Sequence, residues 1–273
     1  ILSDIAASIQ NKVDVRHLTK EQVTGIGIGV PGPVLNENIV QGCVNLGWGN
    51  VRVADELSAL TGLKVKAAND ANVAARLALG QGGGKGYRNI VMFTLGTGVG
   101  GGIIQNGQIV SGANGAAGEI GHMVIVDSDE VVGTCGCGHR GCLEQVASAT
   151  GIVNLTEKKL AECSQDSVLR DISPLTAKDV LDAAKAGDAL AEQAAENMMK
   201  HLGRAAAYIA CVVNPDIFVI GGGVSKAGEY LIEGISRYYK DYAFHASADT
   251  KFALASLGND AGMIGAAGMV CTL

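Results

Sequence analysis

Acids, imidazoles and thiols are concentrated in one stretch of the chain, residues 114–144. Three cysteines follow one another among glycines, with one and then four residues between them, and twelve residues separate a histidine from the first of them. Three thiolates and one imidazole complete a tetrahedral zinc site with no open position. The candidate ligands are His122, Cys135, Cys137 and Cys142. We expect a structural zinc that joins two loop segments and orients the flanking acids Glu119 and Glu144.

The same cysteines have two other interpretations, a disulfide or unrelated buried thiols. A single intervening residue would strain a disulfide between Cys135 and Cys137, and scattered thiols rarely lie among so many glycines. His139 is a second imidazole that could replace His122, although its neighbours are themselves candidate ligands. We favour zinc with His122 because the ligand count then closes at four.

An Asn-Asp pair, Asn69 and Asp70, stands where a predicted strand meets a predicted helix. Both residue types are preferred helix N-caps, and on local sequence alone capping is the favoured explanation. Asp70 gains interest as a catalytic acid or base only beside the glycine loops. Further upstream, Pro31 and Gly32 belong to a rigid turn that can form a backbone wall for a ligand.

Two glycine-rich segments could accept a nucleotide. Residues 96–102 join two strands of a predicted hairpin, where glycine amides and the hydroxyl of Thr97 can approach a polyphosphate; an ordinary glycine-bulged hairpin is an equal alternative. Residues 221–223 separate a strand from a helix, where exposed amides can contact a nucleotide, or simply form a tight turn. The candidate nucleotide contacts are Thr97, Gly98, Gly221, Gly222 and Gly223.

Length, charge and cysteine usage restrict the function classes. The chain has 273 residues, enough for two lobes with separate cores. A formal net charge of −6 argues against a broad surface for nucleic acid or an anionic membrane and favours a small-molecule ligand. The longest apolar run is about half of a membrane span. Seven cysteines, an odd number, fit a reducing compartment, and we expect a cytoplasmic protein.

The hydrophobic pattern predicts alternating strands and helices, an α/β fold. Expected helices cover residues 1–13, 51–60, 73–79, 146–163, 177–186, 188–213, 227–239 and 260–270. Expected strands cover residues 23–30, 63–67, 89–95, 216–220 and 252–257, and strand residues 103–104 and 109–110 flank an expected turn at Asn106 and Gly107. The first helix has no capping residue before it, so we expect a fragment from which preceding strands are absent.

These motifs together resemble the ROK family (repressors, open reading frames and kinases), and within it the zinc-containing bacterial glucokinases. The matching segments are Gly29-Val30-Pro31-Gly32-Pro33, Asn69-Asp70-Ala71-Asn72, Thr94 to Gly101, Gly118-Glu119-Ile120-Gly121-His122, Cys135 to Glu144, and Ile220 to Ser225. They span nearly the whole chain in the family's order. The zinc signature is specific, whereas the glycine motifs alone would be weak.

The resemblance implies an actin-like ATPase (ribonuclease H-like) fold with two lobes around a cleft. We expect residues 1–74 and 260–273 to form a small lobe and residues 75–259 a large lobe with the zinc loop. It also implies Asp70 as catalytic base, with sugar contacts from Pro31, Gly32, Asn69, Asp70, Glu119, His122 and Glu144. Thr97 and Gly98 would lie by the phosphates of ATP, and Gly221, Gly222 and Gly223 by the adenosine.

The expected activity is ATP-dependent phosphorylation of glucose, with Mg²⁺ and a structural Zn²⁺. Alternatives are a kinase for fructose, mannose or N-acetylmannosamine, or the sugar-sensing domain of a ROK repressor. The resemblance also implies a homo-oligomer, a dimer or tetramer. From the net charge we expect no nucleic-acid or membrane partner. No Asp-Leu-Gly-Gly-Thr type phosphate motif precedes Ile1, so we expect this chain alone to be impaired or inactive.

Overall fold

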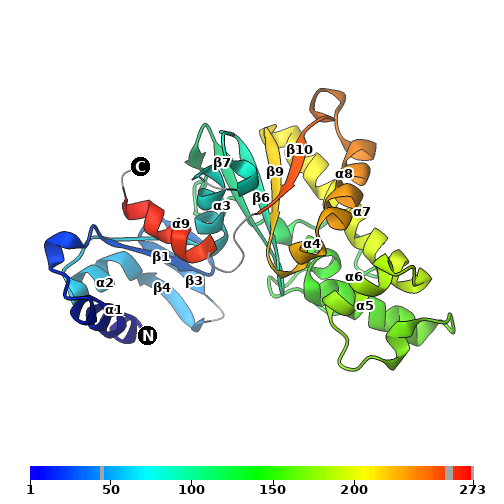
Figure 1. Ribbon diagram of the computed structural model, residues 1–273, viewed down its shortest axis with the longest axis horizontal. Helices are drawn as coiled ribbons and strands as arrows, with labels where there is room; N and C mark the ends of the chain where they lie inside the picture. The colour runs from blue at the N-terminus through cyan, green and yellow to red at the C-terminus, as the bar shows by residue number, and fades with distance from the viewer. Residues whose placement is uncertain (44–45, 81, 256–260, 272–273) are drawn as a thin grey trace.

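Two α/β lobes make up the computed structural model, which describes residues 1–43, 46–80, 82–255 and 261–271 (Figure 1). In the small lobe, two parallel strands form one sheet and three antiparallel strands form another. The parallel pair is β1 (Ile26–Val30) and β5 (Val65–Asn69), and the second sheet is β2 (Val34–Leu35), β3 (Ile39–Cys43) and β4 (Trp48–Arg52). The accompanying helices are α1 (Leu2–Val15), α2 (Val53–Thr61) and α9 (Ala261–Val270).

The large lobe is built on a five-stranded sheet in the order β10-β9-β6-β7-β8. Its strands are β6 (Ile90–Leu95), β7 (Val99–Gln105), β8 (Gln108–Ile109), β9 (Ile217–Gly221) and β10 (Lys251–Leu254). Strands β6, β9 and β10 are parallel, whereas β6, β7 and β8 form an antiparallel meander. Its helices are α4 (Leu143–Ala147), α5 (Ala149–Glu162), α6 (Ala177–Lys185), α7 (Ala189–Val213) and α8 (Glu229–Tyr242).

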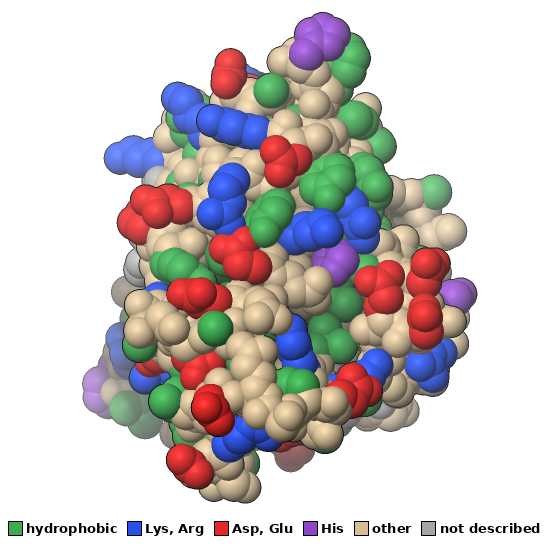
Figure 2. Space-filling model, turned by 90° about the vertical axis from the view of Figure 1, so that its right-hand side faces the viewer, with side chains coloured by type: hydrophobic (Ala, Val, Ile, Leu, Met, Phe, Trp, Pro, Cys, Tyr) green, Lys and Arg blue, Asp and Glu red, His purple; other side chains and the backbone are tan. Residues whose placement is uncertain are grey.

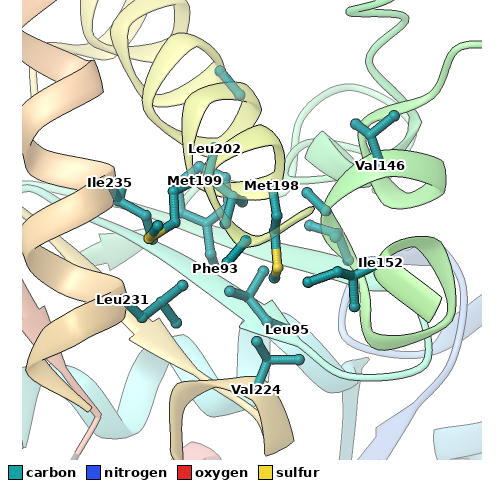
Figure 3. Close-up of a cluster of buried hydrophobic side chains, with 14 of the residues drawn as sticks. Phe93, Leu95, Val146, Ile152, Met198, Met199, Leu202, Val224, Leu231 and Ile235 are labelled. Carbon is teal, nitrogen blue, oxygen red and sulfur yellow. The ribbon is translucent and has the colours of Figure 1, made fainter. Parts of the chain in front are cut away.

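Short 3₁₀ turns complete the secondary structure. They are Lys20–Gln22, Gly82–Gly84, Ile120–His122, Val168–Asp171, Gly223–Ala227 and His245–Ser247. The last strand before the glycine loop, β9, is buried at every position, as its continuous apolar run predicts. Figure 3 shows the main core, where Met198, Met199 and Leu202 of α7 lie over Phe93 and Leu95 of β6. This core fixes the sheet edge from which the glycine loops project.

Helix α3 (Asp70–Gly80) lies where the two lobes meet and packs against α9, β1 and β7. Its contact with α9 is close, because a Cβ on Gly265 would lie 2.0 Å from the carbonyl oxygen of Val73. Strand β1 approaches α9 equally closely, since a Cβ on Gly27 would lie 1.8 Å from the carbonyl oxygen of Ala266. The expected domain boundary at residue 74 falls inside α3, and the division into residues 1–74 and 75–259 stays a prediction.

Most expected elements are present, with four differences. Residues 99–102, expected in the glycine loop, are the first residues of β7, so the turn is confined to residues 96–98. The three-stranded sheet of β2, β3 and β4 was not predicted, because its strands are short and interrupted by glycine and asparagine. The single helix expected over residues 146–163 is two helices that meet at Ser148. A 3₁₀ turn separates the glycines of residues 221–223 from α8. The expected strand end at residues 256–257 and the helix start at Asp260 lie outside the described residues.

Candidate functional site

A cavity of about 780 Å³ lies between the lobes and collects most of the expected site residues. Those that line it are Pro31, Gly32, Asn69, Asp70, Gly98, Glu119, His122, Cys137, Glu144, Gly222 and Gly223. Two expected nucleotide contacts do not line it. Thr97 is exposed at the tip of the β6–β7 hairpin, and Gly221 is buried as the last residue of β9. The volume is within the range of pockets that bind small molecules.

In the Asn-Asp pair, Asn69 caps helix α3 and Asp70 lines the cavity. The side-chain oxygen of Asn69 accepts hydrogen bonds from the amides of Ala71 (2.9 Å) and Asn72 (3.2 Å), as a helix cap does. Its amide nitrogen donates to the carbonyl of Gly32 at 3.2 Å, which joins the cap to the Pro-Gly turn. With Asn69 as the cap, Asp70 is free to line the cavity from the first turn of α3.

Asp70 is exposed to the cavity, although the surrounding protein crowds its carboxylate. Burial raises the pKa of Asp70, and this effect outweighs the backbone hydrogen bonds at Ala71 and Asp70 that lower it. The position of α3 depends on glycines in β7, since a Cβ on Gly102 would lie 2.5 Å from the Cβ of Ala75. The glycines of this hairpin therefore bring the helix of Asp70 close to the sheet.

Three further polar groups face the cavity, Glu119 and His122 from the segment before α4 and Glu144 from its first turn. His122 Nε2 lies 3.9 Å from Glu119 Oε2, and His122 Nδ1 lies 3.9 Å from Glu144 Oε1. Burial raises the pKa of Glu119; His122 opposes this rise, while Asp70 and Glu144 add to it by charge repulsion. The three carboxylates offer hydrogen-bond acceptors, and the imidazole lies between two of them.

The expected metal ligands form one cluster, with all four ligand atoms within 4.8 Å of one another. Cys137 Sγ lies 3.3 Å from Cys135 Sγ and 3.6 Å from Cys142 Sγ, and Cys135 Sγ lies 3.4 Å from His122 Nδ1. Zinc–sulfur bonds of about 2.3 Å at tetrahedral angles place sulfurs about 3.8 Å apart, close to these separations. All three thiols are free, so the cysteines form neither a disulfide nor a scattered set.

His122, rather than His139, belongs to this cluster. His139 is exposed, and its Nδ1 lies 3.5 Å from Cys137 Sγ alone. Because Nδ1 of His122 faces the thiols and Nε2 faces Glu119, one imidazole can serve the metal and the cavity together. The donor set and its spacing fit zinc, which would join the segments around residues 122 and 135–142.

The family model described as "ROK family" matches residues 3–272. The chain belongs to the ROK family.

Within this family, a glucokinase of Halalkalibacterium halodurans is 42% identical over 99% of this chain and 83% of its own. A ROK glucokinase of Streptomyces griseus, solved in complex with glucose and AMPPNP, superposes with a TM-score of 0.81 at 30% identity, over 97% of this chain and 87% of its own. A ROK transcriptional regulator described as a homologue of the E. coli MLC protein gives a TM-score of 0.87 at 27% identity, over 98% and 67%. The fold is therefore the actin-like ATPase fold of ROK proteins.

Several residues of this ROK chain that shape the site were not predicted. Gly42 and Cys43 of β3 line the cavity beside the Pro-Gly turn. On α7, Arg204 donates a hydrogen bond to the carbonyl of Ile125, in the loop that follows His122. Buried His201 lies 3.2 Å from the Arg204 guanidinium, and burial lowers its pKa to about 4. A histidine and an arginine three residues apart in the otherwise largely apolar C-terminal half of α7 were the available signal.

The glycine loop after β9 meets the end of β6. A Cβ on Gly222 would lie 2.4 Å from the carbonyl oxygen of Leu95, so there is no space for a side chain. The φ angle of Gly222 is +87°, which also favours glycine. The two expected nucleotide loops therefore lie side by side at one edge of the sheet.

Within the described ranges, no helix has both the length and the apolar character needed to cross a bilayer.

Proposed function

We propose that the protein transfers the γ-phosphoryl group of ATP to glucose and forms glucose 6-phosphate. The observation that carries the proposal is the placement of Asp70, Glu119, His122 and Glu144 around one cavity that glycine loops also line. Support comes from the relatives, because a glucokinase is 42% identical over 99% of this chain. The proposed roles follow from the chemistry of each side chain.

Asp70 is the proposed general base. A sugar hydroxyl is a weak nucleophile at neutral pH, and a carboxylate within hydrogen-bond reach accepts its proton as the oxygen attacks phosphorus. A pKa raised by burial makes Asp70 a better proton acceptor than an exposed aspartate. Glu119, His122 and Glu144 would hold neighbouring hydroxyls and fix the reactive oxygen beside Asp70. Pro31, Gly32 and Asn69 would close the sugar pocket from the small lobe.

The nucleotide would lie across the hairpin tip and the glycine loop after β9. Gly98, Gly222 and Gly223 line the cavity and let backbone amides approach phosphates and adenosine. Thr97 would have to turn inward from its exposed position to reach a phosphate, and Gly221 would act through the loop it begins. Mg²⁺ bound with ATP would neutralise charge on the phosphates. Zinc held by His122, Cys135, Cys137 and Cys142 would fix the loop that carries Glu119 and Glu144.

A direct test measures ADP release by the purified full-length protein with and without glucose, beside its Asp70→Asn variant. We expect glucose-dependent turnover that falls by about 10²–10⁴-fold in Asp70→Asn, because removal of a general base commonly costs this much. Asp241→Asn, at an exposed position of α8, is the matched control and should keep the wild-type rate. Equal rates for Asp70→Asn and wild type would refute the assignment of the base.

Other hexoses are the alternative substrates. Carboxylates around the pocket can hold the hydroxyls of fructose, mannose or N-acetylmannosamine as well as those of glucose. Comparison of kcat/KM for the four sugars decides between them, since a site that hydrogen-bonds a hydroxyl rejects a sugar that lacks it.

A sugar-sensing repressor domain is the second candidate, and the similarity to a ROK transcriptional regulator supports it. On the face seen in Figure 2, acidic and basic side chains are interspersed, which is not the pattern of a DNA-binding surface. Glucose binding without any phosphate transfer would favour the repressor.

We also propose a cytoplasmic, glycolytic role for the protein. We propose further that it forms a dimer or tetramer, and light scattering of the purified protein can test this oligomeric state.

A further inference from the structure

The corner between α4 and α5 holds the tip of the β6–β7 hairpin, residues 96–98, at two points. The amide of Ala149, the first residue of α5, donates a hydrogen bond to the carbonyl of Gly96 at 2.8 Å. On the other side, the carboxylate of Glu144 lies against Gly98, because a Cβ there would be 2.6 Å from Oε2. One short segment of chain thus contacts both a proposed sugar ligand and the proposed phosphate loop.

This corner is rigid. The side chain of buried Ser148 accepts a hydrogen bond from the amide of Gly151 at 2.9 Å, and its own amide donates to the carbonyl of Glu144 at 3.2 Å. Gly151 packs directly on α4, since a Cβ on it would lie 2.7 Å from backbone atoms of Glu144 and Gln145. Figure 3 shows Ile152 directed toward the core beside Leu95, the residue that precedes the hairpin tip.

The other end of α4 is attached to the metal cluster. Cys142 is the N-cap residue of α4, and it forms an antiparallel bridge with Val124. The amide of Leu143 donates to the carbonyl of Met123 at 2.9 Å, next to His122. A displacement of the metal ligands or of Glu144 would therefore be passed through α4 to the hairpin tip.

We propose that the segment from Cys142 to Ala149 couples the sugar pocket to the ATP site, with Ala149 and Gly98 as positioning residues. The inference rests on the proposed function. A hexose that fixes the carboxylate of Glu144 also fixes the tip at Gly98, while the Ala149 contact holds Gly96. Glucose should then tighten nucleotide binding, and the nucleotide should tighten glucose binding by the same factor.

The Ala149→Pro variant breaks this contact, because the ring Cδ takes the place of the amide hydrogen and displaces the carbonyl of Gly96. Proline is accepted at the first position of a helix, and Ser148 before it is already extended, with φ −90° and ψ 171°. The variant lacks the amide hydrogen that binds the Gly96 carbonyl. Ala189→Pro is the matched control, because Ala189 is the exposed first residue of α7 and follows the extended Asp188.

Calorimetric titration of each protein with AMPPNP, with and without saturating glucose, measures the coupling. In Ala149→Pro we expect AMPPNP to bind about three- to tenfold more weakly with glucose present, the usual effect of one lost hydrogen bond. Glucose affinity without nucleotide should stay within about twofold of wild type. Ala189→Pro should retain the wild-type coupling factor and should melt near the wild-type temperature.

A wild-type coupling factor in Ala149→Pro would overturn the proposal. If that variant does not fold, Gly98→Ala replaces it, because its added Cβ meets only the end of the Glu144 side chain and so displaces the carboxylate without a backbone clash. Gly98→Ala should weaken glucose binding and lower the coupling factor together; a wild-type value for both would also overturn the proposal. Failure of the proposed function appears separately, as absent glucose binding by the unaltered protein.

Discussion

Asp70 illustrates how a functional side chain can lower the stability of the fold. Burial raises the pKa of Asp70, so the folded protein favours its protonated form more than the unfolded chain does. The stability from such a group is present at low pH and is lost as the pH rises through the folded-state pKa. Ionised Asp70 is therefore destabilising at neutral pH.

Asp70→Asn should consequently melt at a higher temperature than wild type at pH 7, while it loses turnover. The difference in melting temperature should shrink as the pH is lowered and wild-type Asp70 takes up its proton. Thermal melts of the two proteins from pH 4 to pH 8 measure this. A variant that melts lower than wild type at pH 7 would show that the aspartate stabilises its surroundings.

The same pKa shift governs catalysis. A general base must be ionised, so kcat/KM should fall as the pH drops through the raised pKa of Asp70. We expect this acid limb to lie above the ordinary aspartate pKa of about 3.9. Rate profiles at subsaturating glucose measure it. An acid limb at the ordinary value would indicate that the carboxylate is solvated in the free enzyme.

At the scale of single residues, the sequence indicated which side chains were candidates for the site better than it indicated what each of them does. The residue types and order identified Asp70, Glu119 and Glu144, but local sequence could not say which member of the Asn-Asp pair caps α3. That choice depends on Gly32, 37 positions away, whose carbonyl accepts the hydrogen bond from Asn69. Thr97 and Gly221 were expected near the nucleotide because they belong to glycine-rich motifs, whose backbone can approach a ligand. Neither residue lines the cavity, because such a motif does not specify which of its atoms face the ligand.

Among the elements, the loop with the metal ligands carries a direct prediction. Purified protein should contain about one zinc per chain, as four ligands with no open position indicate. His122→Ala should lose the metal and raise the KM for glucose, because both the cluster and Nε2 toward Glu119 are removed. His139→Ala should keep both the metal and the KM. Metal analysis of the two variants distinguishes them, and metal lost only from the His139 variant would reverse the ligand assignment.

The packing of α9 on α3 leads to a prediction about stability. Gly265→Ala should destabilise the protein by about 1–3 kcal/mol, since the added Cβ would meet the backbone carbonyl of Val73 and force the helices apart. Gly262→Ala, on the same helix, meets no atom within 4 Å and should be neutral or slightly stabilising, because alanine favours helices. Denaturant unfolding measures both, and equal effects would mean that the close helix contact does not form.

Elements with one dominant signal were predictable and composite ones were not. Strand β9 is a continuous apolar run and β6 is one except for Thr94, and α7 is capped by Asp188, whose side chain accepts hydrogen bonds from Leu190 and Ala191. The break at Ser148 was missed because residues 146–163 keep a helical pattern throughout. Its cause is tertiary, since the contact between Ala149 and Gly96 sets the direction in which α5 begins.

At the scale of the whole molecule, periodicity predicted an α/β chain but not two lobes. The arrangement followed from the resemblance to ROK proteins, and their solved structures confirm the fold. The identity of the sugar could not be predicted in the same way. It depends on the spacing of hydroxyl partners across the cavity, which residue types in a sequence do not specify.

The cavity itself leads to a prediction about the shape of the protein. Its walls come from both lobes, with Gly32 and Cys43 on one side and Glu119 and Glu144 on the other. A ligand that hydrogen-bonds to both walls favours their closer approach, as in other enzymes that close on substrate. Glucose with AMPPNP should therefore lower the radius of gyration in small-angle X-ray scattering, whereas AMPPNP alone should lower it less. Asp70→Asn should close to the same extent if closure needs binding but no proton transfer. An unchanged radius with both ligands bound would mean that the lobes already have their catalytic arrangement.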